Sequence, residues 1–219
     1  ENGRTVSPSS RSSRWANSGV VVEVQAADAP SWLAGDGGAF AGQVGRFHVD
    51  AGEDWMAPWL SASAPAELLG LRLQSVVERV AAQAGGGRQV VPGQRLTDFV
   101  VGRASRDLPD CSYLPGVRSC DLASVLPSPM IDRLRLAVRR FDASMRGYLT
   151  DEAIVVGVES RTSSPVRIPR DPKTRMHPVA PGLYPCGEGA GYAGGIVSAA
   201  FDGDASARAV AAALCPAFA

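Results

Sequence analysis

Residues 183–200, LYPCGEGAGYAGGIVSAA, decide how the C-terminal third of the chain is interpreted. Within them, Gly189, Gly191 and Gly194 have the spacing G-x-G-x-x-G, which joins a strand to a helix in dinucleotide-binding domains. Such a unit continues with a helix, a second strand and an acidic residue about 20 positions further on. Because only 25 residues follow Gly194, we expect these glycines to close a nucleotide-binding unit and not to open one.

The residues around the glycines predict a strand, a turn and a helix in that order. Gly182–Cys186 is typical of a short buried strand, and 195–214 consists almost wholly of small or apolar residues, which favours a helix that approaches a sheet closely. The turn between them presents unpaired N–H groups and the positive end of the helix dipole, which favour an anion. Close helix–sheet packing also selects glycine and alanine, so the motif alone leaves a ligand site and a packing role open.

The composition disfavours some classes of function. The 219 residues include 22 Lys and Arg against 22 Asp and Glu, so no overall charge attracts nucleic acid or an anionic membrane surface. No apolar run approaches the roughly 18 residues of a membrane span. The four cysteines are widely spaced and only two histidines accompany them, so we expect free thiols and no metal site.

Hydrophobic patterning predicts a mixed α/β chain. Apolar residues recur at helical spacing over 65–84 and again over 128–147, where Ser128 and Pro129 favour a helix start. The five arginines of the second helix form either an anion patch or a solvated outer face. Strands are predicted over Val20–Val24, Arg88–Pro92, Ile154–Val158 and Val166–Ile168, a turn over Pro92–Arg95, and a long surface segment over 34–65.

Two further features strengthen a ligand site at the glycines. Glu188 lies at the carboxyl end of the predicted strand, where open α/β sheets bind ligands and where a carboxylate can accept hydrogen bonds from ribityl or ribose hydroxyls. Residues 159–167, ESRTSSPVR, follow the preceding predicted strand and combine two guanidiniums with several hydroxyls beside a proline turn. This segment can contact a flavin ring, a substrate carboxylate or both.

Several blocks of sequence, in order along nearly the whole chain except about 30–65, are familiar. They are RSSRWANSG (11–19), VPGQRLTDF (91–99), SYLPGV (112–117), GVESRTSSPVRIPRD (157–171) and GLYPCGEGAGYAGGIVSAAFDG (182–203). Together they closely resemble the C-terminal portion of the uncharacterised FAD-dependent dehydrogenase family, whose members are two-domain flavoproteins of the glutathione-reductase-like FAD/NAD(P)-binding superfamily.

The resemblance implies an α/β fold: the C-terminal part of a Rossmann-like FAD-binding domain with an inserted substrate or cap domain. The family's N-terminal βαβ unit, which carries the adenine-side glycine motif, is missing here. The implied organisation is a leading segment and junction strand over 1–24, a substrate or cap domain over 25–150 with a long loop at about 34–65, and the C-terminal part of the FAD domain over 151–219.

The function implied is the flavin-proximal and substrate-side portion of an FAD-dependent oxidoreductase of unknown substrate, an enzyme if an N-terminal segment or a protein partner completes it. FAD is the expected cofactor, with its binding in this chain either retained, weakened or lost. No catalytic side chain is predicted, because the flavin carries the electrons. The alternative is a non-catalytic, flavoprotein-derived subunit or scaffold of a larger assembly. The RSSRWAN block and the Ala- and Gly-rich insertion resemble plant and algal plastid relatives, which predicts a plastid location.

The resemblance also assigns residues to the predicted site. Those expected at the cofactor are Gly187, Glu188, Gly189, Gly191, Tyr192, Gly194, Gly195 and Ile196, together with Arg161, Thr162, Ser163 and Ser164. Gln94, Arg95 and Tyr113 are candidates for the substrate side, each with a structural role as an equal alternative.

Overall fold

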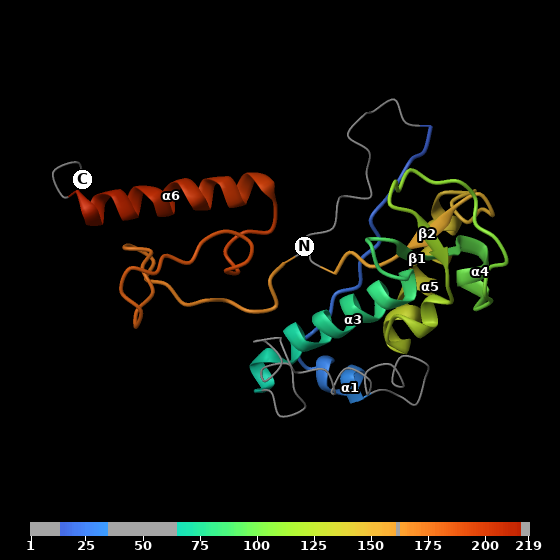
Figure 1. Cartoon of the computed structure of the whole chain (residues 1–219), viewed down its shortest axis with the longest axis horizontal. Helices are drawn as coiled ribbons and strands as arrows, with labels where there is room; N and C mark the ends of the chain where they lie inside the picture. The colour runs from blue at the N-terminus through green and yellow to red at the C-terminus, as the bar shows by residue number, and fades with distance from the viewer. Residues whose placement is uncertain (1–13, 35–64, 161–162, 216–219) are drawn as a thin grey trace. The chain divides into compact units, whose positions relative to one another are not determined.

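The computed structural model of the chain describes residues 14–34, 65–160 and 163–215. The chain divides into two compact units between Ser160 and Arg161, and each unit is described by itself (Figure 1). The long loop expected at about 34–65 lies almost wholly outside the described residues. The domain boundaries expected at 24 and 150 stay predictions.

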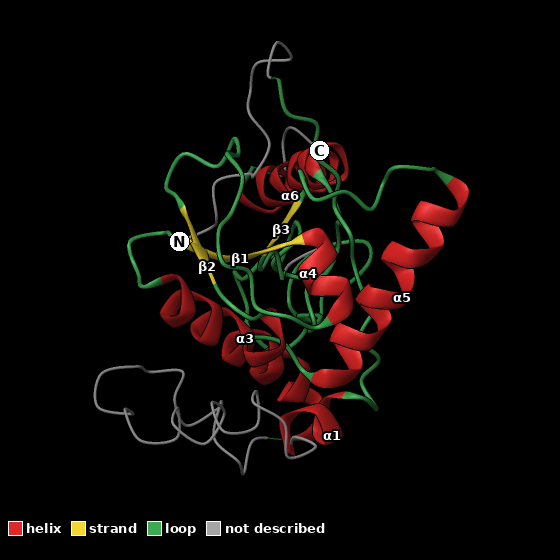
Figure 2. Ribbon diagram, turned by 90° about the vertical axis from the view of Figure 1, so that its right-hand side faces the viewer, coloured by secondary structure: helices red, strands yellow, loops and turns green. Residues whose placement is uncertain are grey.

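The described residues form a mixed α/β chain with five α-helices and a small three-stranded sheet (Figure 2). The first unit contains α1 (Ala29–Ala34), η2 (Ala66–Leu68), α3 (Leu69–Gly85), β1 (Val91–Arg95), α4 (Leu96–Val101), β2 (Val117–Ser119), η3 (Leu122–Ser124), α5 (Ser128–Ser144) and β3 (Ile154–Val156), and the second contains α6 (Ile196–Leu214). The predicted helices over 65–84, 128–147 and 195–214 and the strand beginning at Ile154 are confirmed. No helix of the described residues is long and apolar enough to cross a membrane.

The sheet has the order β2-β1-β3, with β1 parallel to β2 and antiparallel to β3. Its central strand covers Val91–Arg95, so the strand predicted over Arg88–Pro92 and the turn predicted over Pro92–Arg95 are wrong. Arg88 and Gln89 have left-handed φ angles of 55° and 66°, which no strand residue adopts. Pro92 is tolerated because it lies just beyond the last residue of β3, where its carbonyl still accepts a hydrogen bond from Gly157 N at 3.1 Å.

Gly93 lets the three strands approach closely. A Cβ built on Gly93 would lie 2.4 Å from Val117 Cγ1 in β2 and 3.2 Å from the Val155 carbonyl oxygen in β3. Any side chain at this position would therefore push apart both neighbours of the central strand.

The core of the first unit lies where α3, α4 and α5 meet the sheet. The apolar face of α3 contributes Leu73, Val76, Val77 and Val80, and these pack with Phe99 of α4, Ile131 and Val138 of α5, and Trp32 of α1. The helical spacing of these residues is the pattern that predicted α3 and α5 from the sequence.

Two of the four arginines of α5 join helices. Arg135 Nε donates to Phe99 O at 2.7 Å and Arg139 Nη2 donates to Val100 O at 3.1 Å, both at the C-terminal end of α4. Carbonyls at that end lack partners within their own helix and carry the negative end of its dipole. These two arginines therefore attach α5 to α4, which is neither of the two roles considered for them from the sequence.

Three predicted strands are absent from the described residues. Val20–Val24 forms no strand, and Val21 is 68% exposed. Val166–Ile168 and Gly182–Cys186 are irregular. Prolines bracket or interrupt both of these segments, at 165, 169, 181 and 185, and each proline removes a backbone donor that a sheet ladder needs.

The glycine at the centre of the sheet supplies a test of this packing. Gly93→Ala should destabilise the chain by about 1–3 kcal/mol, as overpacking a tight site does. Gly19→Ala is the control, because a Cβ there meets no atom within 4 Å, and it should change the free energy of unfolding by less than about 0.5 kcal/mol. Urea unfolding followed by far-ultraviolet circular dichroism measures both. Equal stability of Gly93→Ala and wild type would show that the strands are not packed as described.

Candidate functional site

The glycine loop, residues 187–195, is attached at its start to α6. Asp202, in the second turn of that helix, accepts a hydrogen bond from Gly187 N at 2.8 Å through Oδ2. Two backbone hydrogen bonds then form turns within the loop: Gly191 N donates to Glu188 O at 2.9 Å, and Tyr192 N donates to Gly187 O at 3.0 Å. The loop thus has a defined backbone path from the end of the preceding segment to α6.

Asp202 also binds two arginines. Arg170 Nη2 and Nη1 lie 2.7 Å and 2.9 Å from its Oδ1 and Oδ2, and Arg175 Nη2 donates to Oδ1 as well. The side chains of Arg170 and Asp202 are each only 9% exposed. Arg170, with help from Gly187 N and Arg175, holds the pKa of Asp202 well below its usual range, and Asp202 in turn raises the pKa of Arg170. This carboxylate is therefore ionised whenever the unit is folded near neutral pH.

The structure brings the segment 163–168 against the glycine loop. Ser164 Oγ donates to Val166 O at 2.7 Å and to Gly189 O at 3.3 Å. Ile168 N donates to Ala190 O at 3.2 Å. Ser163 is exposed beside them, whereas Arg161 and Thr162 lie outside the described residues.

Only some glycines of the loop are required by its backbone conformation and packing. Gly187 and Gly191 have left-handed φ angles of 73° and 80°, and a Cβ on Gly191 would lie 2.7 Å from Val166 O. The fold of the unit itself requires glycine at these two positions. In contrast, a Cβ on Gly189 meets no atom within 4 Å, and one on Gly195 meets only Ser198 Oγ at 4.0 Å.

The start of α6 combines backbone donors with exposed apolar side chains. Gly195 precedes the helix in an extended conformation and provides no side-chain cap. Ile196 is 91% exposed and Phe201 is 73% exposed. With Gly194, Val197 and Ser198 they line a shallow hollow at the helix start. Chemically, this place suits a flat, largely apolar ring whose edge carries negative charge.

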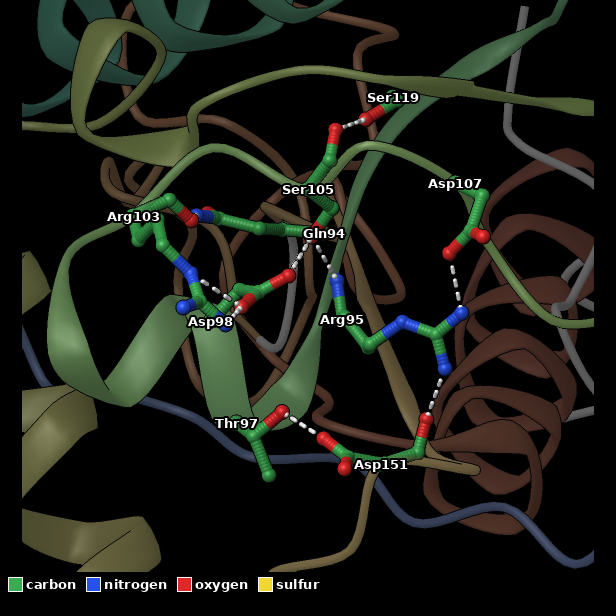
Figure 3. A network of polar contacts seen from close by, with 9 residues as sticks. All are labelled: Gln94, Arg95, Thr97, Asp98, Arg103, Ser105, Asp107, Ser119 and Asp151. Carbon is green, nitrogen blue, oxygen red and sulfur yellow. Dashed lines mark hydrogen bonds and ion pairs between the residues drawn. The ribbon is translucent and has the colours of Figure 1, made fainter.

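The substrate-side candidates Gln94 and Arg95 belong to a polar network in the first unit (Figure 3). Gln94 is fully buried, where its Nε2 donates to Arg103 O at 2.7 Å and its Oε1 accepts from Leu122 N at 3.1 Å. Arg95 Nη1 donates to Asp151 O at 2.5 Å, and its Nη2 pairs with Asp107. Both residues thus make contacts of the kind expected for a structural role.

Asp98 is the acidic centre of the same network. It accepts hydrogen bonds from Arg103 Nε at 2.9 Å and from Ser105 Oγ at 2.8 Å, which lower its pKa. Ser105 Oγ in turn accepts from Arg95 N at 2.9 Å. Tyr113 lies apart from the network, with its hydroxyl donating to Gln89 O at 2.7 Å. A substrate role for Gln94, Arg95 and Tyr113 stays a prediction.

The cysteines and acidic residues do not gather into a metal site in the part of the chain that the structure describes. Cys111, Cys120, Cys186 and Cys215 are all free thiols.

Comparison with known proteins finds similarity mainly in the first unit. Residues 57–162 match the model of the family described as "FAD-dependent protein, C-terminal domain-like". An uncharacterized protein of Clostridium beijerinckii is 41% identical over 138 residues, which are 62% of this chain and 26% of that protein. The chain thus matches about a quarter of that relative's length. The family model ends before the glycine loop, so the match rests on α3 to β3.

The sequence did not single out the residues that organise the loop. Arg170, Arg175 and Asp202 meet although Asp202 lies 32 residues from Arg170, and no periodicity links such positions. The signal was present in the blocks that carried the resemblance, since RIPRD contains Arg170 and SAAFDG contains Asp202.

Replacing Asp202 tests its hold on the loop. Asp202→Asn keeps the shape but removes the charge that binds both arginines, so the amides of residues 187–192 should exchange with solvent about ten-fold faster or more. Asp204→Asn is the matched control, because Asp204 pairs only with the exposed Arg208 one turn along the same helix. Hydrogen exchange with mass spectrometry reads both variants. Equal exchange in the two variants contradicts the role given to Asp202.

The effect of Asp202→Asn on the protection of the loop has a defined pH dependence. The pKa of Asp202 is lower in the folded unit than in the unfolded chain, so its contribution is present above the unfolded value of about 3.9 and is lost as the pH falls toward the folded value. The difference in loop protection between wild type and Asp202→Asn should stay constant from about pH 7 to about pH 5. A decline within that range would show that the carboxylate is not held ionised.

Proposed function

We propose that the chain is the flavin-proximal and substrate-side portion of an FAD-dependent oxidoreductase, and that the glycine loop and the start of α6 hold the flavin end of FAD. The observation that carries the proposal is the open space at Gly189 and Gly195. Nothing in the described part of the unit explains why these positions lack a side chain. A ligand that approaches the backbone closely does explain it.

The properties of the site fit a flavin. Exposed Ile196, Val197 and Phe201 offer apolar contact to a ring system, and the first N–H groups of α6 point out of the helix end beside them. The positive end of the helix dipole favours negative charge at the N1 and C2 carbonyl edge of the ring. We assign Glu188, in the turn of the loop, the role of accepting hydrogen bonds from ribityl hydroxyls. The residues that we assign to the cofactor are Gly187, Glu188, Gly189, Gly191, Tyr192, Gly194, Gly195 and Ile196, together with Arg161, Thr162, Ser163 and Ser164.

The chemistry of the reaction belongs to the cofactor. Bound FAD supplies hydride transfer, and the protein binds it, orients it and sets the electrostatics around it. The comparison supports the flavoprotein assignment through the first unit, since the matching family is described as FAD-dependent. We further propose that a segment or partner carrying an adenine-side glycine motif completes the site, and that the first unit faces the substrate. The plastid location also stays a prediction.

Flavin binding tests the proposal directly. FAD added to the purified chain should change its fluorescence on binding, and Gly195→Leu should weaken the affinity by about ten-fold or more because the new side chain occupies the place of the ring. The variant should still fold, because the φ of Gly195 is −179° and a Cβ there has space. Gly203→Leu, in the middle of the same helix and equally uncrowded, is the control.

The alternative is a non-catalytic subunit, and the exposed apolar side chains at the start of α6 favour it as a contact surface. The same titration separates the two functions. A chain that binds no FAD, either alone or together with a segment carrying an adenine-side glycine motif, is not the oxidoreductase portion proposed here. Unchanged affinity in Gly195→Leu would place the flavin elsewhere.

A further inference from the structure

Three arginines lie beside the glycine loop, but they are not equivalent. Arg170 and Arg175 share the carboxylate of Asp202. Arg167 is exposed, and among the described residues its side chain makes no hydrogen bond or ion pair. Its guanidinium lies over an aromatic ring. One cation at this loop is therefore left without an acidic partner.

The aromatic ring fixes where that cation lies. Arg167 Cζ is 4.4 Å from the centroid of the Tyr192 ring, and Arg170 Cζ is 3.5 Å from the same centroid. Tyr192 is itself held, because its hydroxyl donates to Ile168 O at 2.9 Å and its N–H donates to Gly187 O. A guanidinium over a ring keeps its N–H donors at the edge free for a ligand.

The backbone around Arg167 adds to this restraint. A Cβ on Gly191 would lie 3.1 Å from Arg167 Cα, so the loop packs directly on the backbone of this residue. Arg167 is thus held from two sides, by Gly191 at its backbone and by Tyr192 at its guanidinium. Such a fixed, planar set of donors matches the oxygens of a phosphate.

We propose that Arg167 binds the phosphate of the flavin nucleotide. This inference rests on the proposed function, since it takes the ring of the flavin to lie at the start of α6. Tyr192 and Ile196 are four residues apart, so their Cα atoms are separated by at most about 14 Å. A phosphate at the end of a five-carbon ribityl chain lies within such a distance of the ring. Glu188 then faces the hydroxyls of that chain, and Arg167 faces its charge.

The affinities for three flavins distinguish binding of the phosphate from binding of the ring. Riboflavin carries the ring and the ribityl chain alone, FMN adds one phosphate, and FAD adds the whole diphosphate and adenosine. In wild type, FMN and FAD should bind more tightly than riboflavin. In Arg167→Gln, the affinities for FMN and FAD should fall about ten-fold while that for riboflavin changes by less than about two-fold. Added salt should weaken FMN binding to wild type more than riboflavin binding.

Two further variants serve as controls. Arg208→Gln removes an exposed arginine of the same unit, paired with Asp204, and should leave all three affinities unchanged. Arg167→Lys keeps the charge but loses the planar fork, so it should restore part of the affinity for FMN.

Each other outcome overturns the inference. Equal losses for all three flavins in Arg167→Gln would show that Arg167 acts only by shaping the loop. Unchanged affinities would show that the phosphate lies elsewhere or that the arginine meets a different anion. If wild type binds riboflavin without any preference for FMN, the phosphate site fails while the flavin site stands. If wild type binds none of the three, both fail together.

Discussion

The ion cluster at Asp202 is the interaction on which the second unit depends. A single, nearly buried carboxylate accepts hydrogen bonds from Nη1 and Nη2 of Arg170, from Arg175 and from the backbone N–H of Gly187. Arg170 also donates to Pro185 O at 2.8 Å, so the cluster holds the segment before the loop, the loop and α6 together. The second unit contributes only Pro185 and Ala190 to the buried apolar residues described. Charge pairing and backbone hydrogen bonds, more than an apolar core, therefore order the candidate site.

In the first unit, the close packing and hydrogen bonds of the central strand order the sheet. Its central strand carries Pro92, Gly93 and Gln94 in succession, a combination that weakens most strands. Here Pro92 lies at the end of one pairing, Gly93 allows the close approach of both neighbours, and Gln94 bonds to two buried backbone groups. Gln94 thereby joins the central strand to the backbone at Arg103 and Leu122 within the core. The network around it supports the sheet and helix α4.

Sequence reasoning predicted the three long helices well, but it missed the short helices α1 and α4 and predicted the strands poorly, for physical reasons. The apolar spacing over 65–84 and 128–147 indicates one buried face of a helix. A helix also forms its backbone hydrogen bonds within its own segment. A strand does need one, so Val20–Val24 has the right residues yet remains unpaired in the described structure. Both the loop and the neighbouring segment 163–168 carry recognisable motifs, which is why the sequence assigned them to one predicted site. Asp202 was missed, because a long-range ion pair leaves no spacing to read.

Hydrogen exchange of the whole chain with and without FAD tests the central claim, that the glycine loop and the start of α6 hold the flavin, most directly. The account predicts that FAD slows exchange in residues 163–170 and 187–198, and leaves the buried network around Gln94 and Asp98 unaffected. Protection centred on that network, or no protection anywhere in the chain, would contradict it.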